Sequence, residues 1–485
     1  MRTPTRTLIV AALASVIAFL GFSRVANRTA TIRVLLNEAH QTIDGWEVTL
    51  RFWEQNKTED RYDASWVPYR DQILDRMVNE LGINRVRLAV LSGMENPVDY
   101  WRQFETGQIG YREFRKYRYE KINDNEDPNT ANTTGFQFSQ LNWQVEQILI
   151  PLRRLIEANG EKIYINLCFV DFDGDFEGNL QHALKPDEYA EFINEAFLHL
   201  KTKYGIAPDS LEIILEPDNT AHWRGTQIGA AMVKAVERLR ANGFSPEIVA
   251  PSTAAAHRAP AYFDEMIQVP GVLDVLSTIS YHRYDHFLEP PVAKIRERAD
   301  QHRLKTAMLE HLTGNAQELH TDLKDANVSA WQMWGIAHKT SKPEEINANV
   351  YYEVNVSDPA HPRVGMTLPT RMLAQYFKFI RRGAIRIGAT SNTSSKDPVA
   401  FRNPDGTHVL VVKASCGGDM FVLGLPPGSY RICYTIESQT VGSSSRVDLA
   451  EPVLVKAGEG LTASMPGKGV ITIYQTRSEG SRPKR

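Results

Sequence analysis

The sequence predicts an α/β protein made of a (β/α)8 (TIM) barrel followed by an antiparallel β-domain. Short, almost continuously apolar runs alternate with longer amphipathic segments, which is typical of parallel strands covered by helices on both faces. Eight such units fill about 340 residues, the usual scale of a closed barrel. After Gly383 only short strand-like runs remain. A doubly wound open sheet is the alternative, but no Gly-rich phosphate loop follows the first strand.

The expected barrel elements follow one another in strict alternation. The predicted strands are Thr42–Trp46, Asn84–Val90, Lys162–Val170, Leu211–Leu215, Glu247–Ala250, Val275–Tyr281, Lys305–Leu309 and Ser329–Met333. The predicted helices are Tyr69–Leu81, Leu141–Asn159, Pro186–Tyr204, Gly225–Asn242, Ala259–Gln268, Pro291–His302, Gln317–Asp325 and Thr370–Arg381.

The C-terminal part reads as short strands separated by turns at Asn403–Gly406 and Pro426–Gly428. The predicted strands are Ile385–Ala389, Val399–Arg402, His408–Lys413, Met420–Leu423, Ser429–Thr435, Glu451–Lys456, Gly460–Met465 and Val470–Gln475. Ala30–Leu36 reads as one more strand, before the barrel begins, and we expect it to pair with this domain.

Composition excludes several classes of protein. Of 485 residues, 42% are hydrophobic and 23% are charged, which is ordinary for a globular protein and excludes a disordered chain. The net charge of -3 gives no sign of nucleic-acid binding. The three cysteines, Cys168, Cys416 and Cys433, fit no zinc or redox motif. At most Cys416 and Cys433 pair, and three buried free thiols is the favoured interpretation.

The N-terminus has the pattern of an export signal. Arg2 and Arg6 precede an apolar run from Leu8 to Phe22, which is shorter than the roughly 20 residues of a membrane span. No good cleavage site follows, so an uncleaved anchor stays open. We expect an exported protein, secreted, periplasmic or held by this segment, with no other membrane contact.

One predicted loop, Leu91–Gln140, is unusually long and would lie at the C-terminal face of the barrel, where barrel enzymes keep their active sites. Its aromatic and basic residues suit sugar faces and hydroxyls, but a charged flap with its aromatics packed down is favoured. These residues are Trp101, Tyr111, Arg112, Arg115, Lys116, Tyr117, Arg118, Tyr119 and Lys121. Asn123–Asp127 could hold a cation, but it lacks the glycine and final glutamate of a calcium loop, which favours a polar turn.

Two glutamates end predicted strands. Glu216 closes the run Leu211–Pro217, and Glu310 closes Lys305–Glu310. A charge after an apolar strand is costly unless it is paired or exposed. Ordinary strand-end salt bridges are one explanation. Glycosidic cleavage is the other, because it uses one carboxyl as acid and base and a second as nucleophile.

Three further motifs resemble the clan A glycoside hydrolases, and most closely glycoside hydrolase family 30. Gln41–Trp46 is similar to the opening of that family's barrel, Leu373–Ala384 to its last barrel helix and exit, and Phe401–Leu410 to a hairpin of its β-sandwich. Their order matches from end to end. The resemblance implies a C-terminal β-sandwich that also takes an N-terminal strand, which agrees with Ala30–Leu36.

The resemblance also implies roles for individual residues. Glu216 becomes the acid/base and Glu310 the nucleophile, supported by Arg87 unless Arg87 forms an outer-face ion pair. Tyr281 or Tyr284 supplies a hydroxyl near the nucleophile, His282 is the other polar candidate there, and Trp331 or Trp334 forms the floor of the sugar subsite. Trp46, Trp53 and Trp223 could also line the cleft, with core packing as the equal alternative.

One position departs from the family pattern. Clan A enzymes usually carry asparagine directly before the acid/base, where it binds the sugar 2-hydroxyl, and this chain has Leu215. Either Asn219 or His222 substitutes for it, or the substrate differs at carbon 2, or activity is reduced or lost.

These observations predict an exported retaining glycoside hydrolase that cleaves β-linked glycosides or glycans with Glu216, its pKa raised, as acid/base and Glu310 as nucleophile. The alternative is a catalytically impaired carbohydrate-binding protein on the same fold. A third hypothesis is another clan A family acting on uronic acids or xylosides, which the basic stretch Arg112–Lys121 and Arg283 make conceivable. No Gly-x-Ser-x-Gly, His-Glu-x-x-His or P-loop motif is present.

The expected partner is a carbohydrate substrate, with no nucleic acid, and the chain is expected to be a monomer. The reaction requires no metal and no organic cofactor. The expected domains are residues 1–29 as signal or anchor, 41–382 as catalytic barrel, 30–40 with 383–478 as β-sandwich, and 479–485 as a polar tail.

Overall fold

The computed structural model describes residues 29–172, 180–285, 292–341, 349–437, 446–448 and 451–476. The expected tail and all but the last residue of the expected signal segment lie outside these ranges. Within them, no helix combines the length and the apolar character needed to cross a membrane.

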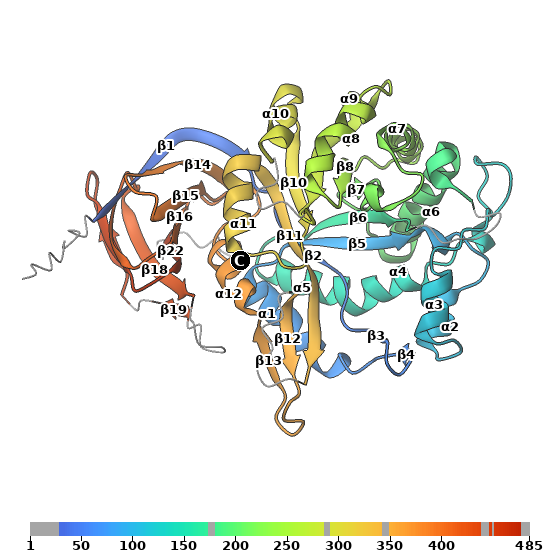
Figure 1. Ribbon diagram of the computed structural model, residues 1–485, viewed down its shortest axis with the longest axis horizontal. Helices are drawn as coiled ribbons and strands as arrows, with labels where there is room; N and C mark the ends of the chain where they lie inside the picture. The colour runs from blue at the N-terminus through green and yellow to red at the C-terminus, as the bar shows by residue number, and fades with distance from the viewer. Residues whose placement is uncertain are drawn as a thin grey trace, which may run out of the picture.

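Eight parallel strands close into a barrel, as the sequence predicts (Figure 1). The pairing of the last strand with both the seventh and the first closes the ring. The strands are β2 (Gly45–Thr49), β5 (Arg85–Leu91), β6 (Tyr164–Val170), β7 (Ser210–Glu212), β8 (Glu247–Thr253), β9 (Leu276–His282), β10 (Lys305–Glu310) and β11 (Val328–Thr340).

Helices surround the barrel where amphipathic runs predicted them, except for the short α9 (Val272–Val275), which was not predicted. They are α1 (Arg70–Arg76), α4 (Ser139–Gln144), α5 (Ile150–Ala158), α6 (Pro186–Tyr204), α7 (Gly225–Ala241), α8 (Ala259–Met266), α9 (Val272–Val275), α10 (Val292–His302), α11 (Ala316–Thr321) and α12 (Leu368–Phe377). The sequence of α6 shows why its bounds were predictable: Pro186 opens it, Asp187 lies in its first turn, and Gly205 ends it in a left-handed conformation.

Some elements were not predicted, because they are too short to show a period. Two strands, β12 (Val350–Asn355) and β13 (Arg363–Met366), extend the barrel sheet beyond β11. Two others, β3 (Gln55–Asn56) and β4 (Arg61–Tyr62), form a small hairpin.

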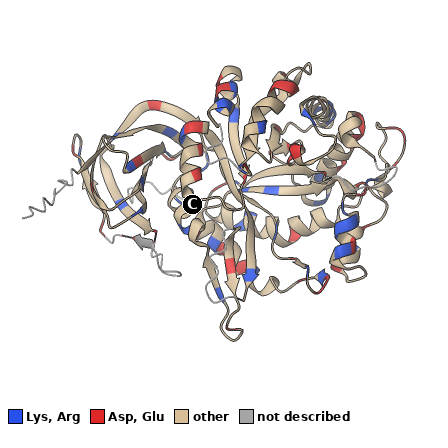
Figure 2. Ribbon diagram, viewed as in Figure 1, with Lys and Arg blue, Asp and Glu red and all other residues tan. Residues whose placement is uncertain are grey.

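The long loop after β5 also contains two unpredicted helices, α2 (Tyr100–Glu105) and α3 (Tyr111–Tyr117). Trp101 and Phe104 of α2 pack edge-on against each other, and Phe104 stacks on Phe114 of α3. The basic residues of α3 lie outside this aromatic cluster, on the helix surface (Figure 2). The interpretation of a charged flap with its aromatics packed down is therefore correct for these helices.

The C-terminal domain is a mostly antiparallel β-sandwich that includes a strand from the N-terminus, as expected. That strand, β1 (Ala30–Thr42), pairs antiparallel with β14 (Ile385–Ser391) and parallel with β17 (Gly418–Leu423). The remaining strands are β15 (Lys396–Arg402), β16 (His408–Ala414), β18 (Gly428–Ile436), β19 (Arg446–Asp448), β20 (Val453–Val455), β21 (Leu461–Met465) and β22 (Gly469–Gln475).

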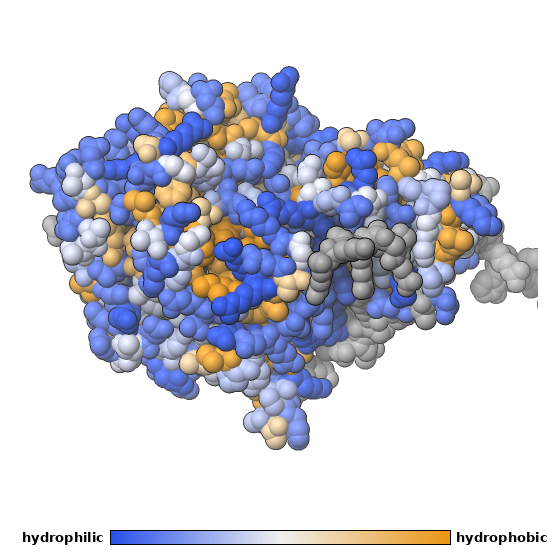
Figure 3. Space-filling model, turned by 180° about the vertical axis from the view of Figure 1, so that it is seen from behind, coloured by the Kyte–Doolittle hydropathy of each residue, from blue (hydrophilic) through white to orange (hydrophobic). Residues whose placement is uncertain are grey.

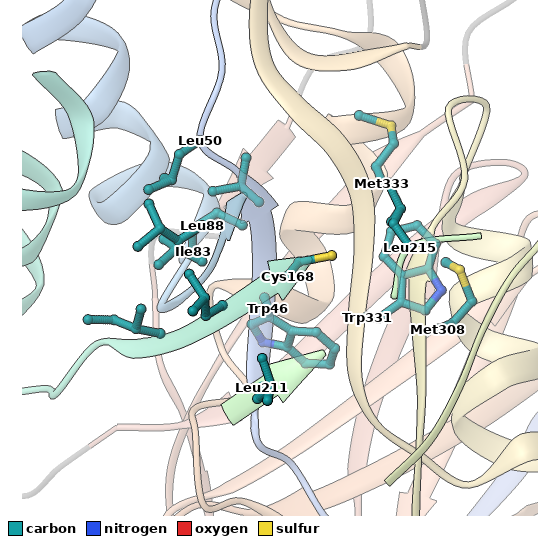
Figure 4. Packing of buried hydrophobic residues seen from close by; sticks show 14 of the residues in the cluster. Trp46, Leu50, Ile83, Leu88, Cys168, Leu211, Leu215, Met308, Trp331 and Met333 are labelled. Atoms are coloured by element: carbon teal, nitrogen blue, oxygen red, sulfur yellow. The ribbon is translucent and has the colours of Figure 1, made fainter. Parts of the chain in front are cut away.

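Two large apolar cores hold these parts together. One fills the space around the barrel and continues into the inner face of the sandwich, and the other lies within the sandwich. Figure 4 shows part of the first, where Trp46 and Trp331 come from neighbouring strands. Trp46 stacks on Phe377 of α12 at 4.5 Å, so it is a core residue and does not line a cleft. The face of the molecule that is turned away from the viewer in Figure 1 is mainly hydrophilic, with hydrophobic patches between the polar residues (Figure 3).

The three cysteines all lie in the described ranges, and none of them forms a disulfide. Cys168 and Cys433 are buried, as expected, but Cys416 is exposed. The expectation of three buried thiols is wrong for Cys416 because it lies in the turn between β16 and β17 and not on a strand face.

The contribution of β1 to the sandwich can be measured. Ile32 is 0% exposed within the sandwich core, whereas Leu36 on the same strand is 42% exposed. Ile32→Ala should lower the free energy of unfolding by about 2–5 kcal/mol because it opens a cavity, and Leu36→Ala by less than about 0.5 kcal/mol. Chemical denaturation of both variants checks this. Equal losses of unfolding free energy in the two variants would show that β1 is not part of the folded core.

Candidate active site

Glu310 lies at the C-terminal end of β10, where the barrel mouth brings it against β5 and the segment after β9. Arg87 of β5 forms an ion pair with its Oε2 atom, and the Tyr284 hydroxyl donates to Oε1 at 2.9 Å. Arg87 is 2% exposed and Glu310 is 7% exposed. The Arg87 pairing with Glu310 is buried, so the alternative of an outer-face ion pair is wrong.

Glu216 lies four residues beyond the end of β7, in a strained turn. Its φ of 48° and ψ of 58° are in the left-handed region, which costs on the order of 1–3 kcal/mol for a residue with a side chain. Its backbone N–H donates to the Ser252 carbonyl on β8 at 3.0 Å, which holds the turn against the sheet. Asn219 Nδ2 donates to Glu216 Oε2 at 2.9 Å. The turn thereby directs the carboxylate over the barrel mouth.

The two glutamates meet around His282. One carboxylate oxygen of each glutamate and one ring nitrogen of His282 lie within 4.8 Å of one another. His282 Nδ1 is 3.0 Å from Glu216 Oε1. A carboxyl separation of about 5–5.5 Å is the spacing of retaining glycosidases, whereas inverting enzymes need about 6.5–9.5 Å to admit a water.

The surroundings of His282 favour its charged form. Burial disfavours the imidazolium, but the hydrogen bond to Glu216 and the charge of Glu310 outweigh it, so the pKa of His282 is raised. Burial likewise acts to raise the pKa of Glu216, but His282, Asn219 and Arg87 together lower it. The expected raised pKa at Glu216 is therefore wrong for the free site, because these neighbours stabilise its carboxylate.

Tyr284 stays a neutral donor to Glu310. Burial and the adjacent carboxylate raise the pKa of its hydroxyl far above the ordinary range. The guanidinium of Arg87 is held in its charged form by Glu310 despite its burial, which raises its pKa. Glu310 thus has two fixed partners, Arg87 and Tyr284.

Beneath the site, polar side chains continue along the barrel axis. Arg87 Nε donates to Thr49 Oγ1 at 3.1 Å, and Thr49 in turn donates to Gln332 at 2.9 Å. Gln332 donates to Glu47, which is paired with Arg85. This chain of contacts fixes the orientation of Arg87 from below. Sequence patterns did not reveal it, because its members are scattered over several strands.

Tyr281 and Trp331 do not line the site, which corrects two of the residues proposed from the resemblance. The Tyr281 hydroxyl and the Trp331 indole both donate to Asp322, which lies in the π-helical turn after α11, outside the barrel. Successive residues of a strand point to opposite faces, so His282 points inward while Tyr281 points outward. Of the two proposed tyrosines, only Tyr284 contacts Glu310.

Arg283 pairs with Asp322 at 3.0 Å in the same outer cluster, so it is not available to an acidic sugar at the site.

Trp334 lines a cavity of about 580 Å³ that opens beside β11 and the segment after β2. The guanidinium of Arg51 lies over its ring at 5.4 Å from the centroid. Trp53 lines the same cavity, with basic side chains around it. These are Arg51, Lys57, Arg115, Arg118 and Lys339. Trp334 is thus the better candidate for a sugar-stacking surface than Trp331.

The position before Glu216 is apolar in environment as well as in sequence. Leu215 is 9% exposed and packs within the same core as Met308 and Trp331 (Figure 4). Of the two replacement candidates, Asn219 contacts the Glu216 carboxylate. His222 is half-buried two residues beyond Thr220.

Sequence reasoning missed the residues that hold these loops. The Asp218 carboxylate accepts the backbone N–H groups of Ala254 and Ala255 at 2.7 and 3.2 Å, which ties the Glu216 turn to the end of β8. Asp171, at the end of β6, pairs with Lys121 at 2.5 Å and accepts the Trp223 indole N–H at 2.9 Å. Trp223 is therefore a buried core residue. An aspartate directly after an apolar strand was the available signal for Asp171.

Two groups of acidic and histidine side chains in the described ranges are close enough to share a cation. One is Glu216, His282 and Glu310, where Arg87 already supplies the positive charge. The other is Asp124, Glu188 and Glu191, outside the barrel mouth.

Comparisons with known proteins agree with this architecture. Residues 383–414 match the model of the glycosyl hydrolase family 30 beta sandwich domain. No curated protein matches the chain by sequence.

Solved structures match over most of the chain at low identity. A GH30 xylanase C catalytic domain from Talaromyces cellulolyticus is 17% identical, with a TM-score of 0.62 over 92% of this chain and 100% of that one. A GH30 endoxylanase from Clostridium papyrosolvens is 16% identical, with a TM-score of 0.60 over 92% and 100%. A glucosidase from Croceicoccus marinus is 12% identical, with a TM-score of 0.55 over 93% and 100%.

The chain therefore has the clan A barrel-and-sandwich fold of glycoside hydrolase family 30. The resemblance stated from sequence motifs is confirmed at this level, and the three neighbours named above are two xylanases and a glucosidase.

The Glu216–His282 pair makes a prediction about stability and pH. Because the pKa of His282 is raised, its stabilisation is complete below pH 6.5 and is lost as the pH rises through the folded pKa. Because the pKa of Glu216 is lowered, its stabilisation is present above pH 4.5 and is lost as the pH falls through the folded pKa.

His282→Gln should therefore lower the free energy of unfolding most near pH 5.5, by about 1.5–3 kcal/mol, the range for hydrogen bonds to charged groups. The loss should shrink at alkaline pH. Denaturation curves of both proteins across pH test this, and a pH-independent difference would contradict a charged pair.

Proposed function

We propose that the chain is a retaining O-glycosyl hydrolase that cleaves β-linked glycosides or glycans. The observation that carries the proposal is the approach of Glu216 and Glu310 to within 4.8 Å at the C-terminal face of a closed barrel. The glycosidases among the structural neighbours support the same class of reaction.

In the first step, Glu310 attacks the anomeric carbon and forms a glycosyl–enzyme ester as the glycosidic C–O bond breaks. Arg87 and Tyr284 hold Glu310 in place for this attack. Glu216 protonates the departing oxygen. Because the pKa of His282 is raised beside Glu216, we infer that His282 supplies this proton to Glu216 across their 3.0 Å contact.

In the second step, the ionised Glu216 removes a proton from water, which attacks the anomeric carbon and releases Glu310. His282 can accept that proton, so the pair returns to its starting state. The two displacements restore the original anomeric configuration. Every group in this reaction is a side chain at the barrel mouth.

Leu215 favours a second candidate function, a carbohydrate-binding protein with impaired catalysis. Clan A enzymes usually carry at this position an asparagine that binds the sugar 2-hydroxyl, and hydrogen bonds to that hydroxyl contribute several kcal/mol in the transition state. A buried leucine cannot make that bond. Retention of Arg87, Tyr284 and both glutamates in one connected arrangement favours the enzyme instead.

The basic cavity beside Trp334 supports glycans with acidic substituents as one substrate class. Arg115 is exposed there, and Arg118 and Lys339 line the same wall. The test panel should therefore include uronic-acid-substituted polymers beside neutral β-glycans.

The catalytic roles can be tested by substitution. On a substrate found in a β-glycan panel, Glu310→Gln and Glu216→Gln should each lower kcat by at least about 10³-fold, since covalent and acid–base catalysis both fail. Glu297→Gln, an exposed change on α10, is the matched control and should keep full activity.

Wild-type turnover in both site variants would overturn the proposal. Binding of a glycan with no turnover by any of the proteins would favour the impaired binding protein.

The stereochemical outcome is a separate test. Retention predicts that the first product formed carries the same anomeric configuration as the substrate, because two inversions occur at carbon 1. Proton NMR of the reaction before mutarotation measures this. An inverted first product would mean that a water molecule fits between Glu216 and Glu310, contrary to their spacing.

A further inference from the structure

A cluster of three carboxylates, two buried and one half-buried, lies outside the active site, between the long loop after β5 and helix α6. Asp124 comes from the loop, and Glu188 and Glu191 lie three residues apart near the start of α6. One oxygen of each carboxylate lies within 4.8 Å of the others. Three like charges at this spacing repel strongly unless something positive lies between them.

The loop is built to present Asp124 to the helix. Asp124 Oδ2 accepts the Asn132 backbone N–H at 2.5 Å and the Asn125 side chain at 2.8 Å, which fixes the turn. A Cβ at Gly135 would lie 2.4 Å from the Asp124 Cβ, so only glycine allows this approach. The other oxygen, Asp124 Oδ1, is buried and has no hydrogen-bond partner.

The same lack of partners extends through the cluster, and this is the second observation. The Glu188 Oε2 and Glu191 Oε1 atoms are buried and have no hydrogen-bond partner among the described residues. Glu191 is only 2% exposed, so solvent does not take the place of that partner. Amide oxygens of Asn123 and Asn194 are also buried and unpartnered, and Asn123 contacts Glu188 through its Nδ2 at 3.5 Å. All five are acceptors. A buried acceptor without a donor is unfavourable by about 1–3 kcal/mol. What these five oxygens lack in common is a positively charged partner.

The neighbouring charged side chains do not supply the positive charge that these oxygens lack. Arg238 is the cation that acts on Glu191, but its Nη1 atom is already bound to the Pro128 carbonyl. Lys185 acts on Glu188, while Glu95 adds further negative charge nearby. Burial first, and then Asp124, raise the pKa of Glu191 to about 8 despite Arg238.

We propose that Asp124, Glu188 and Glu191 bind a hard divalent cation, with Ca²⁺ as the best fit, and that an amide oxygen of Asn123 or Asn194 completes the protein ligands. Carboxylate and amide oxygens are the donors that Ca²⁺ selects. At a Ca–O distance of about 2.3–2.6 Å, two ligand oxygens can lie up to about 5 Å apart, which accommodates the observed spacing.

The cation would fasten the long loop to α6. Lys121, three residues before Asp124, forms the buried ion pair with Asp171 at the end of β6. Holding Asp124 in place would therefore also hold the Lys121–Asp171 ion pair at the end of β6. The ligands come from two distant segments, which is why Asn123–Asp127 does not read as a calcium loop by itself.

Calcium binding by the purified chain is the direct test. After treatment with a chelator, equilibrium dialysis against Ca²⁺ should show one saturable site, and Ca²⁺ should raise Tm. Glu191→Gln keeps the shape of the side chain and should weaken binding on the order of tenfold or more, because ligand charge sets affinity. Asp187→Asn, the exposed neighbour that pairs with Lys234, is the matched control and should bind normally.

Absence of saturable Ca²⁺ binding by the wild-type chain at millimolar concentration would overturn the proposal. So would equal binding by wild type and Glu191→Gln, which would place the ion elsewhere. Stabilisation by Glu191→Gln in the absence of Ca²⁺, together with no binding by wild type, would show that the cluster holds a shared proton. Dialysis of the wild-type chain does not depend on the folding of any variant. It therefore decides the proposal even if Glu191→Gln does not fold.

Discussion

A guanidinium and a carboxylate buried together at the mouth of the barrel constrain everything around them. Neither Arg87 nor Glu310 could be buried alone without a large cost, and together they need further partners for their remaining donors and acceptors. Thr49 and the Leu309 carbonyl take up donors of Arg87, and Tyr284 satisfies the second oxygen of Glu310. Gln332 and the Glu47–Arg85 pair then support Thr49 from below. The interior of the barrel is therefore a polar column and not simply an apolar core, and the Glu310 carboxylate is its upper end.

Glu216 is held in place by hydrogen bonds of its turn, and not by a buried ion pair with an arginine. It lies in a turn with left-handed backbone, kept there by hydrogen bonds from the turn to β8 through Ser252 and Asp218. The turn brings Glu216 to within 3.0 Å of His282, and each of the two shifts the pKa of the other toward its charged form. In the proposed reaction, Glu310 would be the fixed nucleophile and the Glu216–His282 pair would transfer the proton. Leu215 disturbs neither part, because its side chain packs into the core behind the turn.

Much of the fold was predictable because it depends on local pattern. Alternation of apolar runs and amphipathic helices implies a parallel sheet, and Pro186 and Gly205 mark the two ends of α6 through their own backbone preferences. The short elements α2, α3, β12 and β13 were not predictable, since so few residues rarely show a period. The charge pattern at Asn123–Asp127 was visible, but its partners Glu188 and Glu191 lie far along the chain and share no motif with it.

The amino-acid sequence by itself determined the barrel, the sandwich with its N-terminal strand, and the two strand-end glutamates, since each follows from residues close together in the chain or from motifs in a fixed order. Only the tertiary structure decided which side of each strand faces the mouth. It placed His282 and Tyr284 inward and Tyr281 and Trp331 outward on Asp322, because one residue of register exchanges the two faces of a strand. It also decided that the pKa of Glu216 is lowered and that of His282 raised, because a pKa depends on burial and on charges that only folding brings together.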